Sequence, residues 1–180
     1  DNVATIYAVY QAVQKNIPLV SRVVTVTGKE VVRPGNYLVR FGTPVADVIS
    51  YAGGVPASTA KIVGGGPMMG RAMSNLDMPS NKRVSGLLLI PENEARRAEP
   101  ANCIRCAKCV SACPMGLEPY LLSKLSANAR WEDMEKHNVM DCIDCGCCQF
   151  TCPSYRPLLD YIRMGKAEVG GIIRARAAKK

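Results

Sequence analysis

The apolar positions follow a helical period at the start of the chain and a strand-like period further on. In residues 1–20, "ATIYAVYQAVQKN" repeats apolar side chains four residues apart, as at Val9 and Val13, which predicts a short amphipathic helix. The runs "RVVTVTG", "EVVRPG" and "NYLVRFG" then combine β-branched and aromatic residues with Gly, Pro and Asn punctuation. This pattern predicts hairpin strands.

A second short helix and two more strands are predicted after these runs. In "TPVADVISYAGG", Thr43 suits the N-cap, Pro44 the first helical position and Gly53 the end of the helix. The runs "KIVGGG" and "GLLLIP" add strands, so residues 21–92 are predicted to form a small α+β domain of the β-grasp type. The intervening "GGGPMMG" does not match a phosphate-binding loop, and we interpret it as a turn that requires a positive φ.

Residues 93–180, which begin within the polar connector "PENEARRAEPAN", are predicted to form a mainly helical domain. One helical stripe runs through Leu117, Leu121 and Leu125, with three more residues on or near the same side. These three are Tyr120, Leu122 and Trp131. A second helix is expected to open at Pro157 and to stop at the glycine pair of "PLLDYIRMGKAEVGG". Each helix follows a group of cysteines, which indicates an internal, pseudo-twofold repeat.

The composition restricts the class of protein. The chain has 180 residues, 48% of them hydrophobic, which is normal for a globular protein. Its longest apolar run, "VSGLLLI", is too short for a membrane helix. It opens with Asp1 and shows no secretory signal, so we expect a piece of a longer or processed protein. The net charge of +8 is dispersed and only 6% of the residues are aromatic, which disfavours nucleic-acid binding. The basic tail "IIRARAAKK" is expected to be a solvated end, although it could also meet an acidic partner or an anionic membrane surface.

Nine cysteines carry the strongest signal for function. "CIRCAKCVSACP" and "CIDCGCCQFTCP" both space cysteines as C-x2-C-x2-C-x3-C and continue with proline. Three thiolates from one tight loop suit a four-iron, four-sulfur cluster, and in two-cluster ferredoxins the fourth cysteine binds the other cluster. The first expected ligand set is Cys103, Cys106, Cys109 and Cys152, and the second is Cys142, Cys145, Cys148 and Cys113. Zinc or disulfides fit this doubled spacing less well.

Several residues near the motifs need a separate interpretation. The repeat assigns Cys148 to the third ligand place, so Cys147 is expected to be a spare, buried, small apolar residue. The lone His137 is expected on the surface. Two clusters of charge about −2 each would reduce the net charge to about +4. Because the first loop carries Arg105 and Lys108 and the second carries Asp144, we expect the higher reduction potential in the first loop.

The order of these motifs resembles the C subunit of the Rnf (also called Rsx) ion-translocating electron-transport complex. The most specific part is the doubled cysteine motif followed by "YRPLLDYIR". The resemblance implies a soluble-ligand-binding β-grasp (SLBB) domain, a ferredoxin-like domain with two [4Fe-4S] clusters on all eight cysteines named above, and residues 1–20 as the tail of a preceding domain. That domain would carry FMN and NADH, so no flavin or nicotinamide residues and no catalytic residues are assigned here.

The resemblance also implies a role and a location. The parent protein would be an iron-sulfur, electron-transport subunit of a ferredoxin:NAD oxidoreductase, peripheral on the cytoplasmic face of the bacterial inner membrane. Its partners would be other subunits of the complex, with ferredoxin as a candidate redox partner, and the β-grasp unit is expected to dock on a subunit rather than bind a small ligand. Two alternatives stay open: the electron-transfer subunit of a cobalamin reductase, and a non-redox metal-binding scaffold or nucleic-acid-binding module.

Overall fold

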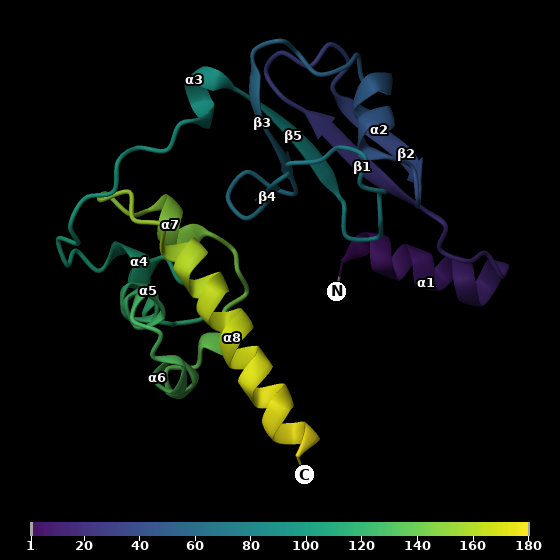
Figure 1. Ribbon diagram of the computed structural model, residues 1–180. Helices are drawn as coiled ribbons and strands as arrows, with labels where there is room; N and C mark the ends of the chain where they lie inside the picture. Colours follow the sequence, from purple (N-terminus) through teal and green to yellow (C-terminus); the bar gives the residue numbers. More distant parts are fainter. Residues whose placement is uncertain (1, 180) are drawn as a thin grey trace. The chain divides into compact units, whose positions relative to one another are not determined.

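The structure, a computed structural model, describes residues 2–179 and divides into two compact units with the boundary between Arg96 and Arg97. The first unit is a small sheet with helices, and the second consists of helices and irregular loops (Figure 1). The first unit contains α1 (Val3–Lys15), β1 (Ser21–Thr27), β2 (Gly35–Arg40), α2 (Val45–Tyr51), β3 (Thr59–Gly64), β4 (Arg71–Ala72), β5 (Gly86–Pro91) and α3 (Glu92–Ala95). None of the described helices is long and apolar enough to cross a membrane.

The five strands form one mixed sheet in the order β2-β1-β5-β3-β4. Strands β1 and β5 run parallel, whereas the other neighbours are antiparallel. A parallel pair cannot be joined by a tight hairpin and needs a longer crossover connection. Here the crossover includes α2 and strand β3. A small sheet followed by a helical region confirms the predicted α+β class.

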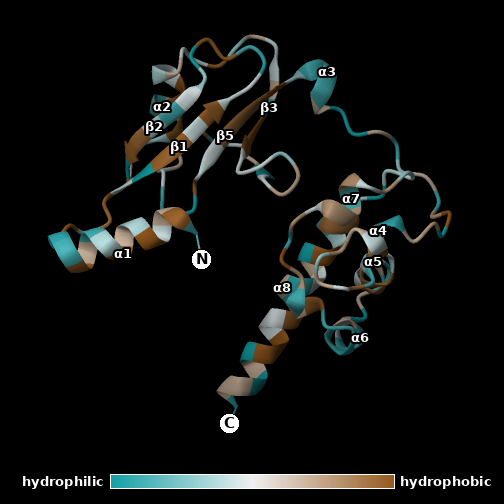
Figure 2. Ribbon diagram, turned by 180° about the vertical axis from the view of Figure 1, so that it is seen from behind, coloured by the Kyte–Doolittle hydropathy of each residue, from teal (hydrophilic) through white to brown (hydrophobic). Residues whose placement is uncertain are grey.

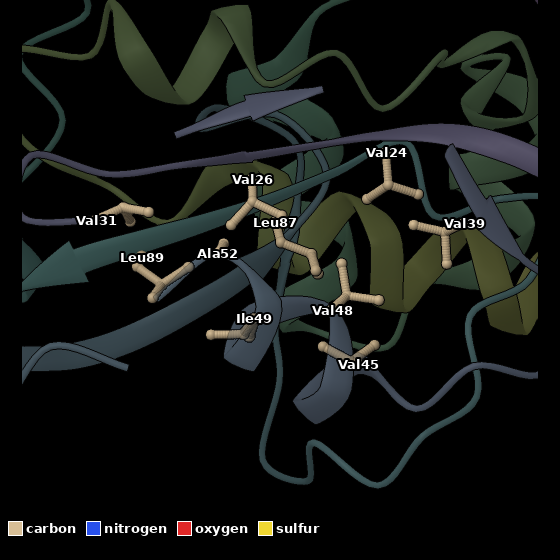
Figure 3. Packing of buried hydrophobic residues seen from close by; sticks show 10 residues of the cluster. All are labelled: Val24, Val26, Val31, Val39, Val45, Val48, Ile49, Ala52, Leu87 and Leu89. Atoms are coloured by element: carbon tan, nitrogen blue, oxygen red, sulfur yellow. The ribbon is translucent and has the colours of Figure 1, made fainter. Parts of the chain in front are cut away.

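One face of the sheet is covered by α2. The burial of β1 alternates, so Val24 and Val26 point toward the core. Figure 3 shows Val48 and Ile49 of α2 close to Leu87 of β5. Burial of one such aliphatic side chain stabilises a fold by about 1.5–3 kcal/mol. The buried cluster comprises Val24, Val26, Val31, Val39, Val45, Val48, Ile49, Ala52, Leu87 and Leu89.

Two details of the predicted first unit are wrong. "EVVRPG" is the connection between β1 and β2 and not a strand, because Pro34 has no N–H for a ladder and the Val31 N–H turns back to the Gly28 carbonyl at 3.3 Å. The helix α2 has Pro44 at its N-cap, without a side-chain cap, so Thr43 lies outside it. Gly53, with a φ of +110°, ends this helix region as predicted.

The "GGGPMMG" segment is the connection between β3 and β4. Gly65 has a φ of +110°, which confirms the predicted turn. Gly70 is needed for a different reason: a Cβ there would lie 2.4 Å from Val63 Cγ1 and 2.6 Å from the Gly66 carbonyl oxygen. The segment therefore packs tightly over β3, and its glycines serve the fold.

Gly28, directly after β1, offers a test of the first core. We expect Gly28→Ala to destabilise the first unit by about 1–3 kcal/mol, because the new Cβ would lie 2.4 Å from the Leu89 carbonyl oxygen. Urea unfolding followed by amide exchange in the strands measures this loss. Gly35→Ala is the matched control, since its nearest neighbours would be 3.9 Å away. Equal midpoints for the two variants would contradict the packing argument.

Helix α1 forms where the apolar spacing predicts it. The Asn2 side chain accepts a hydrogen bond from the Ala4 N–H at 2.9 Å and caps its start. None of its residues is buried, although Val3 and Val13 are apolar and at least 70% exposed. Figure 2 shows hydrophobic residues recurring along this helix.

The second unit is a set of helices around a separate core. It contains α4 (Lys108–Ser111), α5 (Pro119–Ala127), α6 (Trp131–Lys136), the 3-10 turn η1 (Val139–Asp141), α7 (Cys147–Phe150) and α8 (Leu158–Ala178). Helix α8 packs against α5 and α6 at Gly165, where a Cβ would lie 2.4 Å from the buried side chain of Met134. Ser126 of α5 donates a hydrogen bond to the Tyr161 carbonyl at 2.6 Å. The core residues are Leu117, Leu122, Leu125, Met134, Val139, Cys148, Leu158, Ile162 and Val169.

The predicted helices of this unit are present, but three details differ. Leu117 is buried before α5 begins, and Tyr120 is 44% exposed and faces away from the core. Gly170 does not stop α8, because it keeps helical geometry with its backbone buried, and the helix continues to Ala178. The basic tail is consequently helical, and Arg176 forms an ion pair with Glu135 of α6 at 2.8 Å.

The internal repeat predicted from the cysteines is present in the backbone. Thirty-nine residues separate Cys103 from Cys142, and the same interval separates the first residues of α4 and α7 and of α5 and α8. The positive φ angles repeat as well, at 56° for Arg105 and 55° for Asp144. Both loops therefore turn in the same way before the short helix that carries the third cysteine.

Candidate functional site

Four cysteines from both motifs line one cavity in the second unit. Cys113 comes from the end of the first motif, and the other three come from the second motif. Those three are Cys142, Cys145 and Cys148. Apolar side chains of α5 and α8 close much of the remaining wall, among them Leu122, Leu159 and Ile162. This is the second ligand set expected from the sequence.

The local structure explains why these sulfur atoms face one space. The positive φ of Asp144 curls the loop between Cys142 and Cys145, and the positive φ of Gly146 turns the chain into α7, which brings Cys148 to the same cavity. Two backbone N–H groups approach the sulfurs: Leu117 N–H to Cys113 Sγ and Asp144 N–H to Cys142 Sγ, both at 3.4 Å. Such donors stabilise a negatively charged sulfur.

Burial dominates the acid–base properties of the thiols in this cavity. It raises the pKa of Cys148 to about 12 and also raises the pKa of Cys142. Desolvation disfavours a free thiolate, so a bound positive centre must compensate for it before these sulfurs ionise at neutral pH. A metal centre bound in the cavity would supply that compensation.

The first ligand set is only partly assembled. Cys109 and Cys152 lie near enough for the charge of Cys152 to contribute to the raised pKa of Cys109, whose main cause is burial. Cys103 and Cys106 are exposed in the irregular segment before α4. Within this ligand set, the structure therefore brings together one cysteine from each motif, Cys109 and Cys152.

The donor set fits a cluster better than a single ion. Around one zinc ion, sulfurs bound at about 2.3 Å must crowd together in a tetrahedron. In the described residues, no three Cys, His, Asp or Glu side chains converge on one ion-sized point. The four thiols that line the cavity come from both motifs, which suits a cubane whose irons each take a separate cysteine.

Cys147 differs from its expected description. It lies outside the lining of the cavity, whereas its neighbour Cys148 is part of it, but Cys147 is half-exposed and not buried. A side-chain hydrogen bond with Cys145 is the main cause of its raised pKa. His137 follows α6 and is exposed, as predicted.

Two residues beside the cavity were not singled out by the sequence analysis. Arg163 and Lys166 are three residues apart on α8 and both approach Asp144, at 3.8 and 3.6 Å. Lys166 also donates a hydrogen bond to the Cys142 carbonyl. Their positions depend on how α8 packs against the loop, and no local motif indicates this.

Two models of known domains match the chain. The model of the SLBB domain matches residues 23–72, and that of the 4Fe-4S dicluster domain matches residues 95–153. The second range contains all nine cysteines. The dicluster match confirms the expectation of two [4Fe-4S] clusters as cofactors.

Several curated proteins align with nearly the whole chain. Three of them are C subunits of oxidoreductase complexes. The chain is 43% identical over 168 residues to that of the proton-translocating ferredoxin:NAD(+) oxidoreductase complex of Clostridium ljungdahlii, covering 93% of this chain and 37% of that protein. It is 44% identical to that of the ion-translocating oxidoreductase complex of Yersinia enterocolitica (93% and 24%). It is 38% identical to that of the Na(+)-translocating ferredoxin:NAD(+) oxidoreductase complex of Acetobacterium woodii (93% and 38%). The chain thus spans less than two fifths of each of these proteins.

Proposed function

Because this chain is homologous to the C subunits of ion-translocating oxidoreductase complexes, we propose that it relays single electrons through two [4Fe-4S] clusters within such a complex. The main observation that supports this proposal is the cavity, which is lined by one cysteine of the first motif and three of the second. Crossed ligation of this kind is the arrangement of two-cluster ferredoxins. The substrates of the whole complex would be ferredoxin and NAD, as the names of two relatives state for those proteins.

All eight motif cysteines are proposed ligands. The cavity supports the set of Cys142, Cys145, Cys148 and Cys113, and the proximity of Cys109 to Cys152 supports the crossed set with Cys103 and Cys106. When bound, the clusters supply reversible one-electron chemistry. The chain's own residues hold the sulfurs, donate N–H groups to them and surround one site with apolar side chains that limit water.

We propose further that the chain acts beside a membrane, on its cytoplasmic face. Nine cysteines, free throughout the described structure, suit a reducing compartment, and the relatives are named as translocating complexes. Other subunits would be the partners of the SLBB domain. FMN and NADH would bind to a part of the parent protein outside residues 1–180.

Metal and sulfide analysis of anaerobically prepared protein tests the proposal. We expect about eight iron atoms and about eight acid-labile sulfides per chain, because each of the two clusters contains four of each. Dithionite should bleach the visible absorption, and a mild oxidant should restore it. Stoichiometric zinc with no sulfide would instead support a non-redox metal scaffold.

A further inference from the structure

Three charged side chains form a group beside the cysteine-lined cavity. Asp144 lies in the loop between two of the cavity cysteines, and Arg163 and Lys166 approach it from α8. All three side chains are partly buried, with exposed fractions of 31%, 19% and 26%. We call Asp144, Arg163 and Lys166 the α8 charge group. It carries a net charge of +1, so the positive charge of α8 exceeds the negative charge of the loop.

We propose that the α8 charge group sets the reduction potential of the cluster in this cavity, with Arg163 and Lys166 favouring its reduced form. The inference rests on the proposed function, since it requires a cluster at Cys113, Cys142, Cys145 and Cys148. Reduction adds one electron, so nearby positive charge stabilises the reduced state and negative charge destabilises it.

The contacts with Cys142 show how the group reaches the cluster site. The N–H of Asp144 donates to Cys142 Sγ, and Lys166 donates to the Cys142 carbonyl. Both charged residues are therefore in direct contact with Cys142, Asp144 at its sulfur and Lys166 at its carbonyl. Charges that act on this sulfur act on an electron added beside it.

Burial and pairing give these charges more influence than those of the first loop. Arg105, which occupies the place of Asp144 in the repeat, is exposed, and so is Lys108. Exposed charges are screened by water and salt, whereas partly buried charges are screened much less. The loop residues alone predict the higher potential in the first loop, and the two α8 cations act against that difference by raising the potential of the second.

A redox titration of the full, cluster-loaded chain tests the proposal, with dithionite as the one-electron donor. At the wild-type midpoint, Lys166→Gln should lower the reduced-to-oxidised ratio of one cluster about tenfold, a shift of ~59 mV for one electron. Asp144→Asn should raise the same ratio by a similar factor. The double variant should titrate close to wild type, because both charges are removed together.

Arg174→Gln is the matched control, since it removes an exposed cation eight residues further along α8. At the wild-type midpoints, it should change the reduced-to-oxidised ratio of either cluster by less than about twofold. If Lys166→Gln lowers the iron and sulfide content, Arg163→Gln decides, because it keeps the hydrogen bond from Lys166 to the Cys142 carbonyl. A lower midpoint for Arg163→Gln supports the proposal. Unchanged midpoints, or shifts of the same sign for Lys166→Gln and Asp144→Asn, would overturn it. Absence of iron and sulfide in the wild-type chain would instead overturn the proposed function.

Discussion

Replacement of Cys148 by alanine is expected to remove one cluster, whereas replacement of the adjacent Cys147 leaves both. Cys148 is 8% exposed and lines the cavity together with three other cysteines, while Cys147 lies outside that lining. Anaerobically purified Cys148→Ala should contain about half of the wild-type iron and sulfide, since each cluster accounts for half of each. Cys147→Ala should match the wild-type content.

The pair of variants separates the role of a ligand from that of a nearby thiol. Both remove one sulfur from the same short helix, α7, so a general effect of thiol loss would affect them alike. Cys148→Ser provides a further control, because it keeps the size of the side chain and a weaker oxygen ligand. If Cys147→Ala lost a cluster and Cys148→Ala kept both, the register of the second motif would be wrong.

Removal of the clusters is expected to unfold the second unit and to leave the first unit folded. Cys148 lies inside the second core and four other cysteines pack against it, so the proposed ligands and the core form one structure. Burial also raises the pKa of Cys142 and Cys148, so cluster removal leaves neutral thiols that do not join the two motifs. Cluster binding therefore contributes directly to the folding free energy, as in other small metal-built domains.

Amide hydrogen exchange before and after oxidation with a chelator measures this loss unit by unit. The protection of amide hydrogens in α5 and α8 should fall to that of an unfolded chain. The helical signal in far-ultraviolet circular dichroism should decrease. Protection in β1 and β5 should stay unchanged, because the first core contains no cysteine. If α8 kept its protection after the iron was removed, the apolar core alone would be sufficient to keep the second unit folded, and the prediction would be wrong.

The first unit could be predicted from sequence where side-chain pattern and burial agree. Alternation in "RVVTVTG" and the apolar run "GLLLIP" predicted β1 and β5, since both have one buried face. The prediction failed at "EVVRPG", whose β-branched residues suggest a strand although Pro34 prevents ladder pairing. Strand propensity depends on neighbours that one segment does not reveal.

The second unit shows a similar division. Helix α5 followed from leucine spacing and α8 from Pro157 and the apolar spacing after it, but Gly170 and Gly171 suggested an end that α8 does not have. A glycine pair lowers helix propensity by about 1 kcal/mol per residue, and the buried side of α8 compensates for that cost. The expected burial of Cys147 failed for a related reason: position in a motif fixes spacing, and packing fixes exposure.

The sequence by itself determined the chemistry of the site. Eight cysteines at a doubled spacing identify two [4Fe-4S] clusters, because the spacing dictates which thiolates one loop can present. Only the tertiary structure decided the electrostatic surroundings. Arg163 and Lys166 reach Asp144 because α8 packs beside a loop about twenty residues earlier in the chain, and the strength of a charge depends on its burial and on its distance from the added electron.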